Sequence, residues 1–219
     1  MNLELADIWQ MIEEKQKCNG CRLRARKPLI FRLKSPIKVV VVTEGPNRQE
    51  SPEFVASIAN HPTYTFLYTL FGGCFTPIDS TSCQANVYWT HVRKCFLNGT
   101  GRKTIDRALK ICSSAYLAAE IKAARPRLVV AVGRKVLGFF EEFDQRFAGG
   151  LREVVFKKQS GGVFTGVRLD DFICDVSVVP HPSGRNVTWS VPPDNARGQL
   201  EAVRQRIAHV ILDLPQGTS

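Results

Sequence analysis

The chain has 219 residues, of which 44% are hydrophobic and 23% charged, proportions that are ordinary for a globular protein and exclude a fibrous or intrinsically disordered one. Thirty Lys and Arg residues against twenty Asp and Glu residues give a net charge of +10, which fits a merely basic globular protein but favours polyanionic partners, nucleic acid first. The apolar runs are too short to span a bilayer and the N-terminal segment is acidic, so we expect a cytoplasmic protein with no membrane partner.

The first half of the chain is predicted to contain a helix, two buried strands and polar connections. Apolar residues at helical spacing predict an amphipathic helix over residues 3–16, and a nearly continuous valine run predicts a buried strand over residues 37–43. Residues 52–70 are expected to be helical in pieces, and residues 72–82 to form a loop. Valine, tyrosine, tryptophan and threonine then predict a second buried strand that starts at Val87.

The second half alternates helices with strands. Thr104 is expected to cap the start of a helix that ends before Pro126, and Gly133 is expected to end the next strand. The segments predicted after this helix are a strand over residues 128–132, a helix over 135–143, a β-hairpin over 152–168, a strand over 173–179 and a closing helix over 196–212.

This alternation predicts a three-layer α/β/α fold, in which helices cover both faces of a central, mostly parallel four-stranded sheet; we expect residues 1–219 to form it as a single domain. Each main strand is followed by a residue that suits a functional site: Glu44, His91, Gly133 and His181. Because the carboxyl ends of parallel strands meet at one edge of a sheet, we expect these residues to converge. The sequence therefore predicts an active-site cleft at this edge.

The cysteines suggest a metal site, because disulfides are rare in cytoplasmic proteins. A Cys-x2-Cys pair is followed by one cysteine after a predicted strand and one on a predicted helix, and the candidate ligands are Cys18, Cys21, Cys95 and Cys112. Four thiolates can hold zinc or an iron–sulfur cluster, and a single pair with two separated cysteines fits a cluster better. Cys174 is expected in the core, whereas Cys74 or Cys83 remains an alternative ligand, and binding of no metal also remains open.

Four motifs occur in order between Cys18 and Asn186. They are the cysteine spacing, Thr43-Glu44-Gly45-Pro46-Asn47, the stretch from Val87 to Cys95, and His181-Pro182-Ser183. Together they resemble the motifs of the uracil-DNA glycosylase superfamily, most closely its iron–sulfur branch (family 4, with family 5 nearby), which read Gly-Glu-(Ala/Gly)-Pro-Gly and Asn-Val-Val-Lys-Cys in the second and third places.

The resemblance implies a three-layer α/β/α fold and a [4Fe–4S] cluster that is held by the four cysteines and takes no part in the chemistry. It also implies a monofunctional glycosylase of base-excision repair, which hydrolyses the bond between deoxyribose and a deaminated base flipped out of DNA. His181 would donate a hydrogen bond to the departing base, and Glu44 would position water or stabilise the sugar cation.

The resemblance further implies a pocket for the flipped base and a loop that holds DNA. The implied base-binding residues are Gly45, Pro46, Asn47, Phe54, His91 and Ser183. Phe54 would stack on the base, with Phe66 and Phe75 as rivals for this role. The implied DNA-binding residues are Gly184, Arg185 and Asn186, of which Arg185 would contact phosphate.

His91 stands where the family has the Asn that reads the uracil edge, and Asn47 stands where it has Gly. Since histidine has a different pattern of donors and acceptors, hypoxanthine and xanthine join uracil as candidate bases. Each main candidate also has a purely structural interpretation: Glu44 as a helix-capping carboxylate, His181 as a turn residue and His91 as a buried strand residue.

Two other classes of protein remain open. One is a non-catalytic iron–sulfur protein of the same fold that binds nucleic acid, and the other is a zinc-stabilised nucleotide-binding protein. The expected partner of the glycosylase is DNA that contains a damaged base, and we expect a monomer.

Overall fold

The computed structural model describes residues 3–21, 28–32, 36–46, 66, 70–71, 86–96, 101–181 and 194–213, with only the backbone given for residues 194–197. The segments predicted as a broken helix (52–70, apart from residues 66 and 70) and as a loop (72–82, throughout) lie outside these residues.

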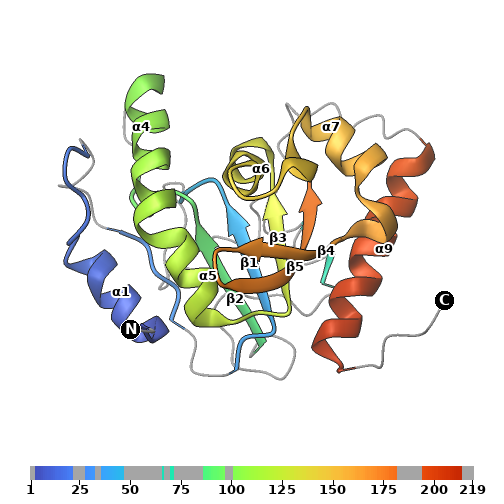
Figure 1. The fold of residues 1–219 in the computed structure, drawn as a ribbon, viewed down its shortest axis with the longest axis horizontal. Helices are drawn as coiled ribbons and strands as arrows, with labels where there is room; N and C mark the ends of the chain where they lie inside the picture. Colours follow the sequence, from blue (N-terminus) through green and yellow to red (C-terminus); the bar gives the residue numbers. More distant parts are fainter. Residues whose placement is uncertain are drawn as a thin grey trace.

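The described residues form a five-stranded sheet with the order β2-β1-β3-β5-β4. Its strands are β1 (Val39–Thr43), β2 (Val87–His91), β3 (Leu128–Val132), β4 (Phe164–Leu169) and β5 (Phe172–Val179). The strands β2, β1, β3 and β5 are parallel, and β4 is antiparallel to β5 at one edge. The carboxyl ends of β1, β3 and β5 point to the top of Figure 1. The prediction of a mostly parallel sheet is confirmed, whereas its count of four strands is wrong.

The extra strand comes from the segment that the sequence predicted as a hairpin over residues 152–168. Its first part is helical, as α7 (Leu151–Glu153) and a π-helical turn (Val154–Lys158), and only its last part is the strand β4. The Gly161-Gly162 pair, which is also typical of a hairpin turn, has another role in this structure. An added Cβ at Gly162, where φ is +75°, would lie 2.6 Å from the backbone N of Val203. This glycine therefore permits close packing of the closing helix.

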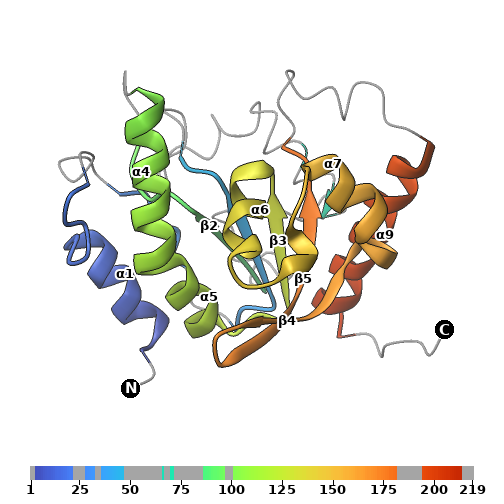
Figure 2. The same cartoon turned by 45° about the horizontal axis from the view of Figure 1, so that its top comes forward.

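Helices cover both faces of the sheet, so the architecture is a three-layer α/β/α sandwich. The helices are α1 (Leu5–Glu13), α4 (Arg102–Cys112), α5 (Ala118–Ala124), α6 (Arg134–Glu141) and α9 (Asp194–Ile211). A π-helical turn, Ser113–Leu117, joins α4 to α5. In Figure 2, α6 lies in front of the sheet, beside the helix formed by α4 and α5. Gly101, and not Thr104, occupies the N-cap of α4, because the helix starts one turn earlier than predicted.

The valine run of β1 explains why both faces need a cover. Val40 and Val42 belong to the core shared with α1, α4, α5 and α6, and Val39 and Val41 belong to the core shared with α9. Successive side chains of a strand point to opposite faces of the sheet. An uninterrupted apolar strand therefore needs a covering layer on both faces. Within the described parts of the chain, no helix is both long and apolar enough to cross a membrane.

Candidate active site and cysteine pocket

The residues that follow the parallel strands converge at the carboxyl edge of the sheet, as predicted. The register pairs Thr43 of β1 with His91 of β2, and Val132 of β3 with Val179 of β5. Glu44 and Gly133 come directly after Thr43 and Val132, and His181 follows Val179 with Pro180 between them. This edge therefore brings together a carboxylate, two imidazoles and a glycine from four strands.

Gly133 lets His181 lie against the end of β3. Its N–H donates to the Val179 carbonyl (2.8 Å), and its φ is +90°. A Cβ added at Gly133 would lie 3.0 Å from the Cβ of His181. Glycine is required here both for the left-handed backbone and for the close approach of His181, which is half-buried. The sequence predicted this glycine as the end of a strand but gave no sign of its contact with His181.

The turn after β1 is joined to the segment after β2 by its backbone. The N–H of Val92 donates to the Thr43 carbonyl (2.9 Å), and the N–H of Arg93 donates to the Glu44 carbonyl (3.0 Å). Glu44 and Gly45 are half-buried, and Pro46 is buried. The turn that carries Glu44 is therefore held against the segment that follows β2, with the Glu44 side chain half-exposed at the edge of the sheet.

His91 is completely buried in the structure, at 0% exposure. Its Nδ1 lies 2.6 Å from Thr43 Oγ1, which also accepts a hydrogen bond from Trp89 Nε1 (3.3 Å). The rings of Phe31 and Trp89 lie 6.0 and 5.7 Å from the imidazole. Burial, reinforced by the nearby charges of Lys94 and Arg93, holds the pKa of His91 well below its usual value. His91 is thus a neutral, hydrogen-bonded strand residue here, and its contact with a base stays a prediction.

Six of the predicted site residues lie outside the described residues: Asn47, Phe54, Ser183, Gly184, Arg185 and Asn186. So do the alternative stacking residue Phe75 and the alternative ligands Cys74 and Cys83. Phe66, the other alternative for stacking, is half-buried and packs against the core beneath α9.

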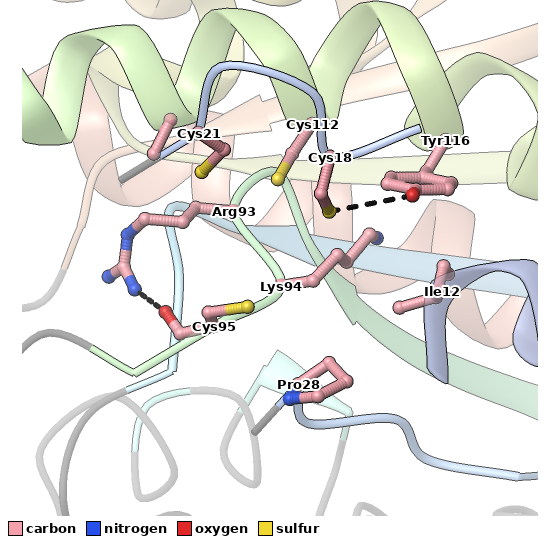
Figure 3. Close-up of a pocket in the computed structure, with 10 residues that line it drawn as sticks. Ile12, Cys18, Cys21, Pro28, Arg93, Lys94, Cys95, Cys112 and Tyr116 are labelled. Atoms are coloured by element: carbon pink, nitrogen blue, oxygen red, sulfur yellow. Dashed lines mark hydrogen bonds between the residues drawn. The ribbon is translucent and has the colours of Figure 1, made fainter. Parts of the chain in front are cut away.

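The four predicted cysteine ligands line one pocket (Figure 3). Cys18 and Cys21 lie just beyond α1, Cys95 follows β2, and Cys112 ends α4. In Figure 3 the sulfurs of Cys18, Cys21 and Cys112 lie on one side of the pocket, and Cys95 faces them from the other. Pro28 and Cys95, which form an isolated antiparallel β-bridge, line the pocket on the side of Cys95. Cys174 is buried in β5, in the core that includes Val176, as predicted.

The thiols of this pocket influence one another. Burial, together with the neighbouring Cys112, Cys18 and Cys21, raises the pKa of Cys95 to about 12. Burial also raises the pKa of Cys112, although a hydrogen bond from the Lys94 backbone opposes this shift. The Tyr116 hydroxyl accepts a hydrogen bond from the Lys17 N–H (2.9 Å) and lies 3.5 Å from Cys18 Sγ, to which it can donate. The pocket thus holds four thiols that can ligate a soft metal ion, and the Tyr116 hydroxyl can donate a hydrogen bond to one of them.

In the described parts of the chain, no group of three or more His, Cys, Asp or Glu side chains is arranged to hold a single metal ion. The four sulfurs surround a space rather than one point. Thiolates in this number suit zinc or an iron–sulfur cluster, and the choice between them is taken up below.

A buried polar network lies behind the pocket, and sequence reasoning missed it. Lys94 Nζ donates to Glu120, to Thr90 Oγ1 (2.8 Å) and to the His91 carbonyl (2.5 Å). The other Glu120 oxygen accepts from the Tyr88 hydroxyl (2.7 Å) and from Thr90 Oγ1 (3.1 Å). The signal was present in β2, where Tyr and Thr alternate with Val and Trp, and so place two hydroxyl groups on one face of a buried strand.

Comparison with known families agrees with this arrangement. The sequence model of the uracil DNA glycosylase superfamily matches residues 33–205. The match contains all five strands and the turn of Glu44, and the Cys18–Cys21 pair precedes it. A comparison with curated proteins finds no match. Because the matched segment covers most of the sequence, the chain belongs to the uracil DNA glycosylase superfamily.

Proposed function

We propose that the protein hydrolyses the N-glycosidic bond of a deaminated base in DNA, uracil first, as a monofunctional glycosylase of base-excision repair. The observation that carries this proposal is the convergence of Glu44 and His181 at the carboxyl edge of a sheet that belongs to this superfamily. The net charge of +10 favours the polyanionic substrate.

The chemistry follows from where charge develops. The target base has to leave the duplex, and the bond between its nitrogen and C1′ of the sugar then breaks. The bonding electrons move onto the base, and positive charge builds on the sugar. A hydrogen bond from His181 to the base would stabilise the negative charge, and the Glu44 carboxylate would stabilise the sugar or position the water that adds to C1′. Ser183 to Asn186 would contact the DNA around the base.

We further propose that the protein is a member of the iron–sulfur branch and that Cys18, Cys21, Cys95 and Cys112 hold a [4Fe–4S] cluster. A zinc ion needs all four sulfurs about 2.3 Å from one point, whereas a cluster places an iron between each thiolate and the centre and so spreads the ligands. The space that the four side chains surround favours the cluster. A cluster would brace the structure, and zinc remains the alternative.

The experiment is a cleavage panel on anaerobically purified protein. Duplex and single-stranded oligonucleotides would carry one uracil, hypoxanthine, xanthine or no lesion, and alkali would reveal abasic sites. We expect cutting at uracil. Cutting only at hypoxanthine or xanthine would mean that His91 moves the specificity, and cutting before alkali would contradict the monofunctional reaction.

Matched variants separate catalysis from folding. Glu44→Ala and His181→Ala should each lower the cleavage rate by about 100-fold or more with an unchanged circular dichroism spectrum. Glu142→Ala, an exposed position at the C-terminal end of α6, should leave the rate unchanged. Full activity in both site variants would refute the proposed roles, and DNA binding without cutting of any lesion would favour a non-catalytic nucleic-acid-binding protein.

A further inference from the structure

Arg93 joins the cysteine pocket to the turn that carries Glu44. It follows β2, lines the pocket and is buried, at 3% exposure. Its Nη1 donates to the carbonyl of Cys95, and its Nη2 donates to the carbonyl of Pro46 (3.5 Å). The Arg93 side chain therefore contacts both the backbone of Cys95, a predicted metal ligand, and the backbone of Pro46 in the turn that carries Glu44.

Each residue of the turn contacts Arg93 in a different way. The Glu44 carbonyl accepts from the Arg93 backbone N–H (3.0 Å), and Pro46 accepts from the guanidinium. Gly45 lies between them, against the guanidinium itself. An added Cβ at Gly45 would lie 2.6 Å from Cζ and 2.9 Å from Nε of Arg93. The guanidinium thus occupies the space that any other residue at position 45 would need.

The chemistry of arginine suits this link. A guanidinium is planar and presents donors on several sides, so it can hold two carbonyls at once, whereas a lysine ammonium is a point charge on a flexible stem. Cysteines that bind metal do so as thiolates. The charge of Arg93, which lines the same pocket, is then attracted by the ligand set, and the attraction fixes the side chain against Gly45.

We propose that Arg93 is a positioning residue, which sets the position of the Glu44 turn according to the state of the cysteine pocket. Loading of the pocket orders the turn, and emptying it releases the turn through Arg93. The proposal rests on the proposed function for the importance of Glu44 and on the four cysteines as the metal ligands. It assigns to the pocket an effect on the active site beyond bracing the fold.

The first test does not depend on activity. Hydrogen exchange of peptides that contain residues 40–46 would be compared in protein as isolated and after removal of its metal by reductant and chelator. We expect exchange in this turn to become at least about tenfold faster on removal, while β4 and β5 change little. In Arg93→Val, which removes both side-chain donors, we expect the turn to exchange fast in both states. Arg168→Val, on the exposed side of β4, is the matched control and should behave as the native protein.

The second test uses the contact with Gly45. Gly45→Ala should lower the single-turnover rate by about 100-fold, because a small displacement of a catalytic group has an effect of this size. The double variant Gly45→Ala with Arg93→Val should cleave at about the rate of Arg93→Val alone, because valine leaves space beside position 45 and the added methyl group then displaces nothing. Arg93→Lys, which keeps the charge, should lower the rate without loss of iron and provides a second variant if Arg93→Val folds poorly.

The outcomes separate this inference from the proposed function. If no lesion is cut but the turn still responds to metal removal through Arg93, the proposed function fails and the positioning role stands. The role is overturned if metal removal leaves the turn unchanged, if it loosens the turn equally in Arg93→Val, or if the protein as isolated contains neither iron nor zinc. It is also overturned if Gly45→Ala slows Arg93→Val as much as it slows the native protein.

Discussion

Gly133 lies against His181, and because the glycine has no side chain, the histidine can approach the end of β3. The glycine has a φ of +90°, and its missing Cβ leaves the space that the Cβ of His181 approaches. The same glycine occupies the N-cap of α6, so its backbone ends a strand, starts a helix and faces the proposed catalytic histidine.

Gly133→Ala should therefore affect both stability and activity. The strained backbone should lower the free energy of unfolding by about 1–3 kcal/mol, and displacement of His181 should lower the cleavage rate by about 10- to 100-fold. Gly138→Ala is the matched control, since it lies within α6 with nothing near its added Cβ and should stabilise the helix slightly. Urea unfolding and single-turnover cleavage would measure both effects, and normal activity in Gly133→Ala would contradict the positioning of His181.

His91 predicts a specific dependence of stability on pH. Its pKa in the folded protein is well below the value of about 6.5 expected in the unfolded chain. As the pH falls below about 6.5, the unfolded chain takes up a proton that the folded protein does not bind, so the free energy of unfolding decreases, by at most about 1.4 kcal/mol per pH unit. In His91→Asn this contribution should disappear. Urea unfolding between pH 7.5 and 4.5 would show it, and equal slopes in the two proteins would refute the assignment.

At the scale of elements, β2 is attached to α5 by charge as well as by packing. Lys94 and Glu120 are exposed by only 2% and 1%. Their partners on β2 are the hydroxyls of Tyr88 and Thr90, and Tyr88 also accepts from Trp9 Nε1 of α1 (2.9 Å). One network thus joins the edge strand β2 to two helices just behind the cysteine pocket.

Lys94→Met should lower the free energy of unfolding by about 3–5 kcal/mol, because it leaves the Glu120 carboxylate buried without its cation. Adding Glu120→Gln should recover a large part of this loss, since glutamine is neutral and keeps an acceptor for Tyr88 and Thr90. Lys122→Met breaks a surface pair with Asp171 and should cost at most about 1 kcal/mol. A double-mutant cycle by urea unfolding would measure the coupling, and a loss below about 1 kcal/mol in Lys94→Met would contradict it.

The sequence predicted elements best where one physical rule dominates. The valine runs of β1 and β3 and the stripe on α4 were recognised because burial on both faces, or on one face, leaves a regular pattern. The prediction of a hairpin in the segment that contains α7 was wrong. Two adjacent buried valines and a Gly-Gly pair fit either a hairpin or a helix that packs closely on α9. Only tertiary contacts decide between these, and they are absent from local sequence.

The placement of the candidate residues along the sheet was predictable, but their contacts were less so. Parallel topology alone places Glu44, Gly133 and His181 at one edge, and the Cys-x2-Cys pair pointed to a shared pocket. Sequence could not show that Arg93 turns back to Pro46 or that His91 is wholly buried, because a side chain's direction depends on what packs around it.

At the scale of the whole molecule, the cysteine pocket joins segments that are far apart in sequence. It is lined from the end of α1, from Pro28, from the segment after β2 and from α4. A group bound here cross-links four parts of the chain, and binding to the folded state alone stabilises that state.

If the pocket holds the proposed cluster, its removal should lower the Tm by about 5–10 °C, which corresponds to about 2–3 kcal/mol. Cys112→Ser should lose iron and visible absorbance and show the same lower Tm without chelator. Cys174→Ser, which is equally buried but lies in the core of β5, should keep its iron. Iron analysis and thermal unfolding would measure both variants, and retention of iron by Cys112→Ser would refute the ligand assignment.

The central place of β1 has a consequence for the protein before it folds. Its neighbours β2 and β3 begin only at Val87 and Leu128, so during synthesis the four consecutive valines leave the ribosome long before either partner strand exists. An unpaired apolar run of this kind associates readily with copies of itself, and a flanking charge opposes this. Lys38 directly precedes the run and, once the chain is folded, bonds to the Ile211 carbonyl (2.9 Å) and to Asp213 (2.5 Å). The same lysine would thus oppose association of the unpaired strand, and in the folded protein it anchors the end of α9.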